Sequence, residues 1–156
     1  YESKQAIFDE IIQRVVKNDK DVAIKNDLPT EREGEYFVSS LDDFISFTLD
    51  QFSFYAIDEF GSAFRKMVML EQFRNIDMIE LYRSIFLTGP IEYTAKVFKS
   101  LIDDKKLKGS DAEQMAKEYY SSFFMYLSLS DYTSDKIKLI QELKDQLLIF
   151  KRNHGG

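Results

Sequence analysis

The sequence predicts an all-α protein of about seven helices. Apolar residues recur at spacings of three and four along nearly the whole 156-residue chain, which is the repeat of helices that bury one face. Six glycines and two prolines are too few for a protein rich in tight turns, and no useful length of chain alternates between apolar and polar residues as a half-buried strand does. The length fits one domain or a small pair, and the 44% hydrophobic content supports a packed core.

The first helix is predicted from about Ser3 to Lys17. Ser3 is a residue type that favours the N-cap position. The helix carries one apolar stripe, formed by Ile7, Phe8, Ile11, Ile12, Val15 and Val16. Residues 18–34 are polar and contain Pro29 and Gly34, which predicts a loop.

Three helices are predicted in the middle of the chain. The second covers residues 37–55, where aromatic and aliphatic residues share a face. Gly61 indicates a break, after which a shorter helix covers residues 64–73. The fourth begins at Asp77 and carries Met78, Tyr82, Ile85 and Phe86.

Three more helices are predicted after Thr88-Gly89-Pro90. Proline suits the first helical position, so Pro90 indicates the start of a helix that ends at Gly109, a residue type common at left-handed C-caps. Ser110 and Glu113 match the capping-box pattern and predict the next helix, which runs to about residue 130. The last helix covers residues 134–152.

The composition excludes several chemistries. The chain has no Cys and one His, His154, so thiolate sites, histidine triads and multi-histidine metal sites are ruled out. We therefore expect no cofactor, no metal and no enzymatic activity. The carboxylate pairs Asp42-Asp43 and Asp103-Asp104 do not converge on one substrate atom, because adjacent helical residues point about 100° apart.

The net charge and hydropathy bear on partners and location. Lys and Arg number 21 against 27 Asp and Glu, a net charge of −6, which disfavours these residues as a nucleic-acid surface. No stretch approaches the roughly 20 apolar residues of a membrane span, and nothing at the start resembles a signal peptide. We expect a soluble, cytoplasmic protein with no membrane partner.

The last two helices predict a homodimer. On the helix of residues 112–130 the apolar arc covers roughly half the circumference, wider than the stripe of a helix that contacts only its own core. A four-helix interface with a second copy would cover it. The residues predicted for this interface are Tyr120, Phe124, Leu127, Ile140, Leu143, Leu147 and Phe150. The alternative is that both helices cover the core of a monomer.

The segment Tyr1 to Phe8 resembles a signature of the TetR family of transcriptional regulators. It matches the pattern aromatic-x-Ser-Lys-x-x-Leu/Ile-Phe, which in that family joins the DNA-reading helix-turn-helix to the connecting helix. Residues 106–116 are similar to a weaker family pattern, and the order of the elements also matches. The resemblance implies that residues 1–17 are the connecting helix and residues 18–156 the effector-binding and dimerisation domain.

The resemblance also implies a DNA-reading domain that precedes Tyr1 and is absent here. We expect the chain to be a regulatory fragment of a longer protein; the alternative is a domain that lost its DNA reader. In the intact protein the resemblance places Lys4 on a DNA phosphate, with Tyr1 nearby.

The aromatic surplus predicts a pocket for a small effector. The chain contains 14 Phe and 9 Tyr, and large rings on crossing helices leave gaps that Met fills adaptably. A pocket of this kind suits a flat or lipophilic molecule, and the resemblance implies an effector cavity among these helices. The candidate lining residues are Phe60, Phe64, Met67, Met78, Tyr82, Phe86, Tyr93, Phe98, Tyr119 and Phe123. The alternative is that they form an ordinary core.

These observations predict the regulatory domain of a TetR-like regulator. The expected action is repression, controlled by a small, largely apolar ligand, with operator DNA bound through the missing N-terminal domain. The alternative function is a stand-alone helical dimeric binding or scaffold protein with no DNA link.

Overall fold

The computed structural model describes residues 3–26, 28 and 40–155, except for the side chain of Lys4. The described chain is all-helical, as predicted, and contains no strand. Among these residues, no helix has the length and apolar character needed to cross a bilayer. The helices are α1 (Lys4–Lys25), α2 (Leu41–Ala56), α3 (Glu59–Glu71), α4 (Ile76–Phe86), α5 (Thr88–Asp103), α6 (Ala112–Leu129), the 3-10 helix η2 (Ser130–Tyr132) and α7 (Lys136–His154).

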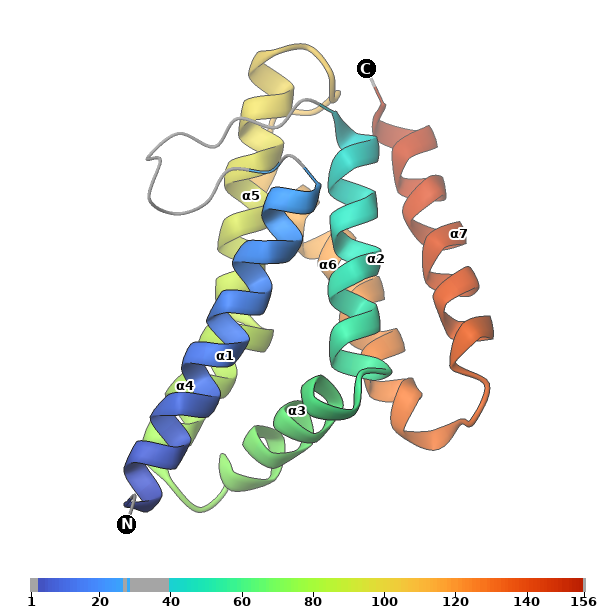
Figure 1. Cartoon of the computed structure of the whole chain (residues 1–156). Coiled ribbons are helices and arrows are strands. Elements are labelled where there is room, and N and C mark those ends of the chain that lie inside the picture. The colour runs from blue at the N-terminus through green and yellow to red at the C-terminus, as the bar shows by residue number, and fades with distance from the viewer. Residues whose placement is uncertain (1–2, 27, 29–39, 156) are drawn as a thin grey trace.

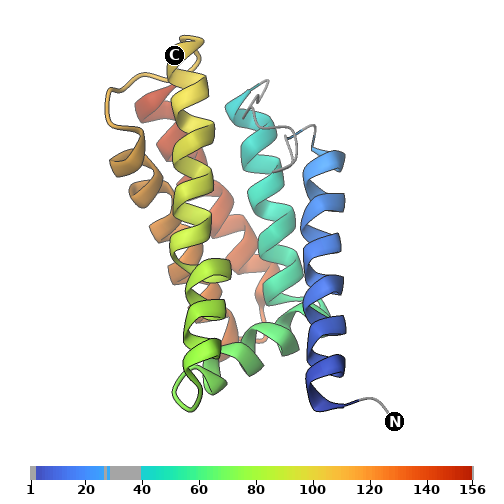
Figure 2. The ribbon, with the colours of Figure 1, turned by 90° about the vertical axis from the view of Figure 1, so that its left-hand side faces the viewer.

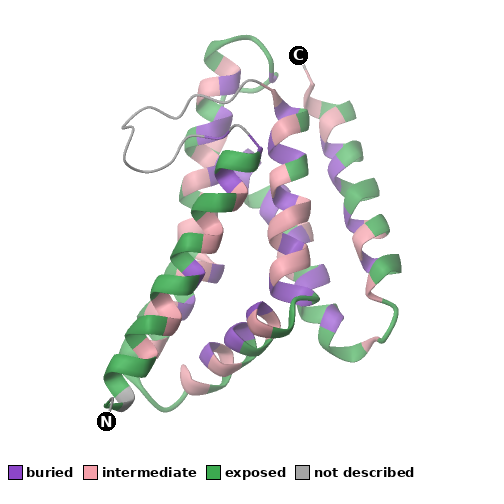
Figure 3. Ribbon diagram, in the orientation of Figure 1, coloured by how far each residue is buried: buried purple, intermediate pink, exposed green. Residues whose placement is uncertain are grey.

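Helix α2 lies at the centre of the molecule. It packs against α1, α3, α6 and α7, and Figure 1 shows it between α1 on one side and α7 on the other. Because it has neighbours on several sides, most of its surface is buried or half-buried, whereas α1 is largely exposed (Figure 3). Phe52 and Ala56 are fully buried. The core therefore surrounds α2, and α1 is a peripheral helix.

Helix α1 is longer than the sequence predicted. The Oγ of Ser3 accepts a hydrogen bond from the backbone N–H of Ala6 at 3.0 Å, so the predicted N-cap is confirmed. The predicted end at Lys17 is wrong, because the helix continues to Lys25. The extra turns are held by α2: Ala23 is buried, and the Nδ2 of Asn26 donates to Asp50 at 3.0 Å. Pro29 and Gly34, predicted to lie in a loop, are outside the described residues.

Gly61 does not break the chain between α2 and α3. It lies in the first turn of α3, where its N–H donates to the N-cap side chain of Asp58 at 2.9 Å. A Cβ at this position would lie 2.2 Å from the carbonyl oxygen of Phe54. The residue is therefore needed for the close approach of α3 to α2, and the break lies at Ile57 and Asp58.

Helices α4 and α5 lie end to end along one side of the molecule (Figure 2). The helical conformation is interrupted at Leu87, with φ −125° and ψ −85°. Pro90 is the third residue of α5 rather than the first, and it has no N–H to donate to the carbonyl of Phe86. The hydroxyl of Tyr120 on α6 donates to that carbonyl instead. A Cβ on Gly89 would lie 1.8 Å from the carbonyl oxygen of Ser84, so the break has no room for a side chain there.

The ends of α5 and α6 differ from the predicted caps. Helix α5 ends at Asp103, and the left-handed residue is Lys105, with φ 59°, rather than Gly109. The N–H of Lys106 donates to the carbonyl of Leu101 at 2.8 Å, which is the hydrogen bond of a Schellman motif. The N-cap of α6 is Asp111, which accepts from the N–H of Gln114 at 3.0 Å, so Ser110 is not the cap.

Most residues predicted for the dimer interface are buried within this chain. Helix α6 packs against α5 and α2 as well as α7, so its wide apolar arc is covered internally. Tyr120, Leu127, Leu143, Leu147 and Phe150 are each at most 8% exposed. Phe124 and Ile140 are half-buried and retain a surface that a partner could contact. Exposed apolar side chains also lie on the outer faces of these helices: Met125 and Leu129 on α6, and Ile137, Leu148 and Ile149 on α7.

An ion pair between the buried Arg65 and the more exposed Asp131 joins α3 to the segment between α6 and α7. The guanidinium of Arg65 contacts both carboxylate oxygens of Asp131, with one nitrogen–oxygen distance of 2.9 Å, and its Nε donates to the carbonyl of Tyr55 at 3.0 Å. Its side chain is 4% exposed. Hydrogen bonding to Arg65 lowers the pKa of Asp131. The pair fixes the corner where α2, α3 and η2 meet.

We expect Asp131→Ala to lower the free energy of unfolding by about 3 kcal/mol, because it leaves a buried guanidinium without its charge partner. Lys66→Ala is the matched control, since the Lys66 ammonium lies 3.9 Å from Asp131 on a side chain that is 46% exposed. Such a pair contributes less than about 1 kcal/mol. Unfolding in guanidinium chloride measures the stability of both variants. Equal losses of unfolding free energy would contradict the role given to the Arg65–Asp131 pair.

Candidate ligand-binding pocket

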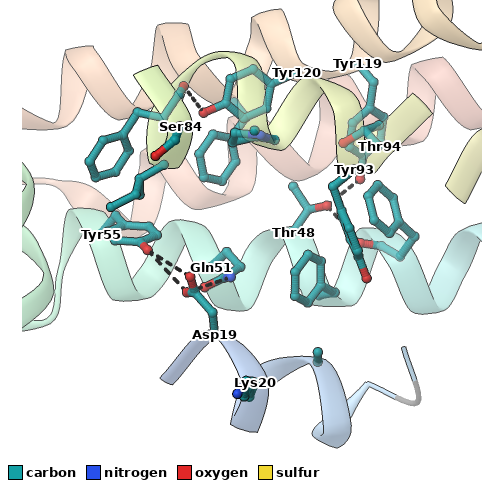
Figure 4. A pocket seen from close by; sticks show the side chains of 18 of the residues that line it. Asp19, Lys20, Thr48, Gln51, Tyr55, Ser84, Tyr93, Thr94, Tyr119 and Tyr120 are labelled. Carbon is teal, nitrogen blue, oxygen red and sulfur yellow. Dashed lines mark hydrogen bonds between the residues drawn. The ribbon is translucent and has the colours of Figure 1, made fainter. Parts of the chain in front are cut away.

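A pocket of about 340 Å³ lies between α1 and the aromatic core. Its wall is formed by residues of α1, α2, α4, α5 and α6 (Figure 4). The break between α4 and α5 lies in this wall, since Phe86, Gly89 and Pro90 all line the pocket. The volume falls at the lower end of the range of small-molecule sites, about 300–1,000 Å³.

The structure places four of the ten predicted lining residues in the pocket wall: Phe86, Tyr93, Tyr119 and Phe123. The other six lie elsewhere. Phe64, Tyr82 and Phe98 are buried in the core, whereas Phe60, Met67 and Met78 are half-buried. The Phe60 ring packs under the guanidinium of Arg14, 3.8 Å from its centroid.

Sequence reasoning did not find the part of the pocket that α1 and α2 supply. The pocket is also lined by Asp19 and Ala23 of α1 and by Phe44, Phe47 and Gln51 of α2. Asp19 and Ala23 follow Val15 at spacings of four, so they continue its buried stripe. That signal was available in the sequence but fell in the segment predicted as a loop.

The polar end of the pocket is centred on Asp19. Its Oδ1 accepts hydrogen bonds from the Nε2 of Gln51 at 3.0 Å and from the hydroxyl of Tyr55 at 3.2 Å. Figure 4 shows the Asp19 side chain reaching from α1 to these two residues of α2. Burial raises the pKa of Asp19 to about 6, although the hydrogen bonds from Gln51 and Tyr55 partly offset this effect. Burial and the nearby Asp19 both raise the pKa of Tyr55, which stays a hydrogen-bond donor.

Three further hydroxyls that line the pocket, those of Thr48, Tyr119 and Tyr120, are paired within the protein. Thr48 donates to the carbonyl of Phe44 at 2.8 Å, and its oxygen lies 2.6 Å from the hydroxyl oxygen of Tyr119. Because a hydroxyl has one hydrogen to donate, Tyr119 is the donor of this second bond. Tyr120 donates to the Phe86 carbonyl. By contrast, the Oε1 of Gln51 is buried and has no hydrogen-bond partner in the described structure.

Within the described ranges, no three His, Cys, Asp or Glu side chains come together as metal ligands. Comparisons with protein-family models, curated proteins and solved structures gave no match to the chain. The assignment of a function therefore rests on the chain's own residues. Tyr1, predicted to contact DNA, lies outside the described residues. Lys4, predicted to contact a DNA phosphate, is the first residue of α1, and its side chain is not described.

We expect Asp19→Asn to change how stability depends on pH. The folded-state pKa of about 6 lies about two units above the unfolded value. The wild type therefore loses up to about 3 kcal/mol of stability as pH rises from about 4 to 7. The Asn variant lacks this loss, so its free energy of unfolding should gain on the wild type over this range.

Asp21→Asn is the matched control, because Asp21 is an exposed carboxylate on the same helix. Its stability should follow the wild type at every pH. Urea unfolding at a series of pH values measures all three proteins. Parallel curves for the wild type and Asp19→Asn would contradict the burial of an ionisable carboxyl in this pocket.

Proposed function

We propose that the chain is the effector-binding and dimerisation domain of a TetR-like transcriptional regulator, a repressor whose DNA affinity is controlled by a small, largely apolar ligand. The observation that carries the proposal is the pocket of about 340 Å³ with α1 as one wall. The resemblance of residues 1–8 to the family signature supports the same assignment, because it makes α1 the helix that leads to the DNA reader.

The attachment of α1 supports a role for this helix in transmitting the signal. Val15 and Ala23 are its buried residues among the described side chains, and its packing is mainly against α2. From Asp19 to Lys4 the helix extends about 22 Å. A small tilt at the pocket therefore becomes a larger displacement at the N-terminal end.

The proposed mechanism has two states. The ligand fills the pocket and binds better to one position of α1 than to the other, as any ligand-driven shift requires. The displaced ends of α1 change the spacing of two DNA readers across a homodimer. Half-sites on DNA lie about one helical turn apart, so a shift of a few ångströms alters the fit.

The alternative is a stand-alone helical binding or scaffold protein. The pocket and the exposed apolar faces fit this reading too, since neither requires DNA. The coding sequence upstream of Tyr1 separates the two. A basic helix-turn-helix there supports the regulator, and a start codon at that point supports the alternative.

A screen of small aromatic molecules by thermal shift tests the pocket, because a ligand that binds the native state raises its apparent stability. We expect stabilising compounds whose affinity falls about ten-fold in Phe47→Ala. Phe54→Ala is the matched control: both phenylalanines are half-buried on α2, but Phe47 lines the pocket and Phe54 does not. A screen without a stabilising compound, or equal losses in the two variants, would contradict the proposal.

A substitution on the outer face of α6 tests the proposed homodimer. Met125 is 50% exposed, so Met125→Asp leaves the fold intact and places a charge in the proposed interface. We expect the wild type to sediment as a dimer at micromolar concentration and this variant as a monomer. Leu70→Asp is the control, since Leu70 on α3 is 63% exposed and lies outside the interface. A monomeric wild type would contradict the dimer.

A further inference from the structure

The polar end of the pocket contains unfilled hydrogen-bond acceptors. The Oδ2 of Asp19 lies 3.5 Å from the Tyr55 hydroxyl, which is too long for a strong hydrogen bond. The Oε1 of Gln51 is buried and unpartnered. Because the Gln51 amide nitrogen donates to Asp19, the oxygen of the same amide lies beside the carboxylate. A ligand that donates hydrogen bonds would fit this end of the pocket.

No cation of the described chain neutralises this carboxylate. The ion pairs of the described residues do not include Asp19. Lys20 also lines the pocket but forms no ion pair with Asp19, and Lys25 pairs with Asp50 at 3.3 Å. An unpaired charge in an apolar pocket is costly, and such residues concentrate at functional sites.

The opposite part of the pocket is aromatic. The rings of Phe44, Phe47 and Tyr93 form a cluster with centroid separations of 5.7, 6.1 and 6.2 Å. The ring faces of such a cluster bind flat apolar groups and attract a neighbouring positive charge. The pocket thus combines one carboxylate with a set of rings.

Taking the pocket as the ligand site of the proposed function, we propose that its ligand is an aromatic amine in its protonated form. The ammonium group is held by Asp19 and Gln51. The ring system lies against Phe44, Phe47 and Tyr93. An ammonium group supplies up to three N–H donors, which match the unfilled oxygens, and its charge matches the carboxylate. A carboxylic acid would be repelled, and a neutral molecule would leave the carboxylate without a counter-charge.

Two probes of nearly equal shape test the charge requirement: 2-(1-naphthyl)ethylamine and its neutral counterpart 2-(1-naphthyl)ethanol. Isothermal titration calorimetry at about pH 7.5, where Asp19 is ionised, compares them on the wild type. We expect the amine to bind at least about ten-fold more tightly than the alcohol.

Variants then assign the preference to Asp19. In Asp19→Asn the amine should lose about ten-fold in affinity, whereas the alcohol should change by less than about two-fold. Asp21→Asn, on the exposed side of the same helix, should bind both probes as the wild type does. Gln51→Met, which removes the unpartnered oxygen, should also weaken the amine more than the alcohol. Circular dichroism confirms that each variant is folded.

These measurements distinguish a failure of the amine proposal from a failure of the proposed pocket function. Equal affinity for the two probes in the wild type, with Phe47→Ala weakening both, would overturn the amine and leave the ligand pocket intact. An amine preference that persists in both Asp19→Asn and Gln51→Met would also overturn the assignment to this site. If neither probe binds at millimolar concentration, the proposal of an amine ligand is overturned, and the proposed function of the pocket loses its support.

Discussion

The hydrogen bond from Tyr120 to the Phe86 carbonyl is the interaction on which the pocket depends. Pro90 deprives that carbonyl of its helical donor, and a buried carbonyl without a partner is costly. The Tyr120 hydroxyl restores the bond from α6, and its ring stacks on Phe123 at 5.2 Å. The break between α4 and α5 is thus fixed to α6, and the residues on both sides of it form the back wall of the pocket.

The front wall differs from the back wall in how it is held. Helix α1 is attached mainly to α2, through few buried side chains and the hydrogen bonds of Asp19 and Asn26. Elements that respond to ligands are drawn from the less stable parts of a structure. In this arrangement the ionised Asp19 destabilises the empty pocket, and a bound cation would remove that cost. In the proposed mechanism, binding and the position of α1 are coupled because the carboxylate that joins α1 to α2 also faces the proposed ligand.

The sequence predicted the helices better than it predicted their contacts. Periodicity located each helix, and Ser3 identified the cap of α1, because these features depend on local residues. The extension of α1 to Lys25 was missed because polar residues there are held by hydrogen bonds to α2, 24 to 36 residues away. Only four of the ten predicted pocket residues line the site. The other six were predicted wrongly because aromatic character alone does not distinguish a pocket wall from a core. Tyr120 was predicted at a subunit interface, but the unpaired carbonyl that it satisfies arises from a break in a different helix.

The most direct test of the account is whether a bound ligand moves α1 relative to α5. The chain has no native cysteine, so Glu10→Cys with Lys99→Cys places spin labels at two exposed sites, one on each helix. Double electron–electron resonance measures their separation with and without saturating 2-(1-naphthyl)ethylamine. If the ligand moves α1 as proposed, the distance distribution should shift by roughly 3 Å or more. Superimposable distributions at saturation would contradict it.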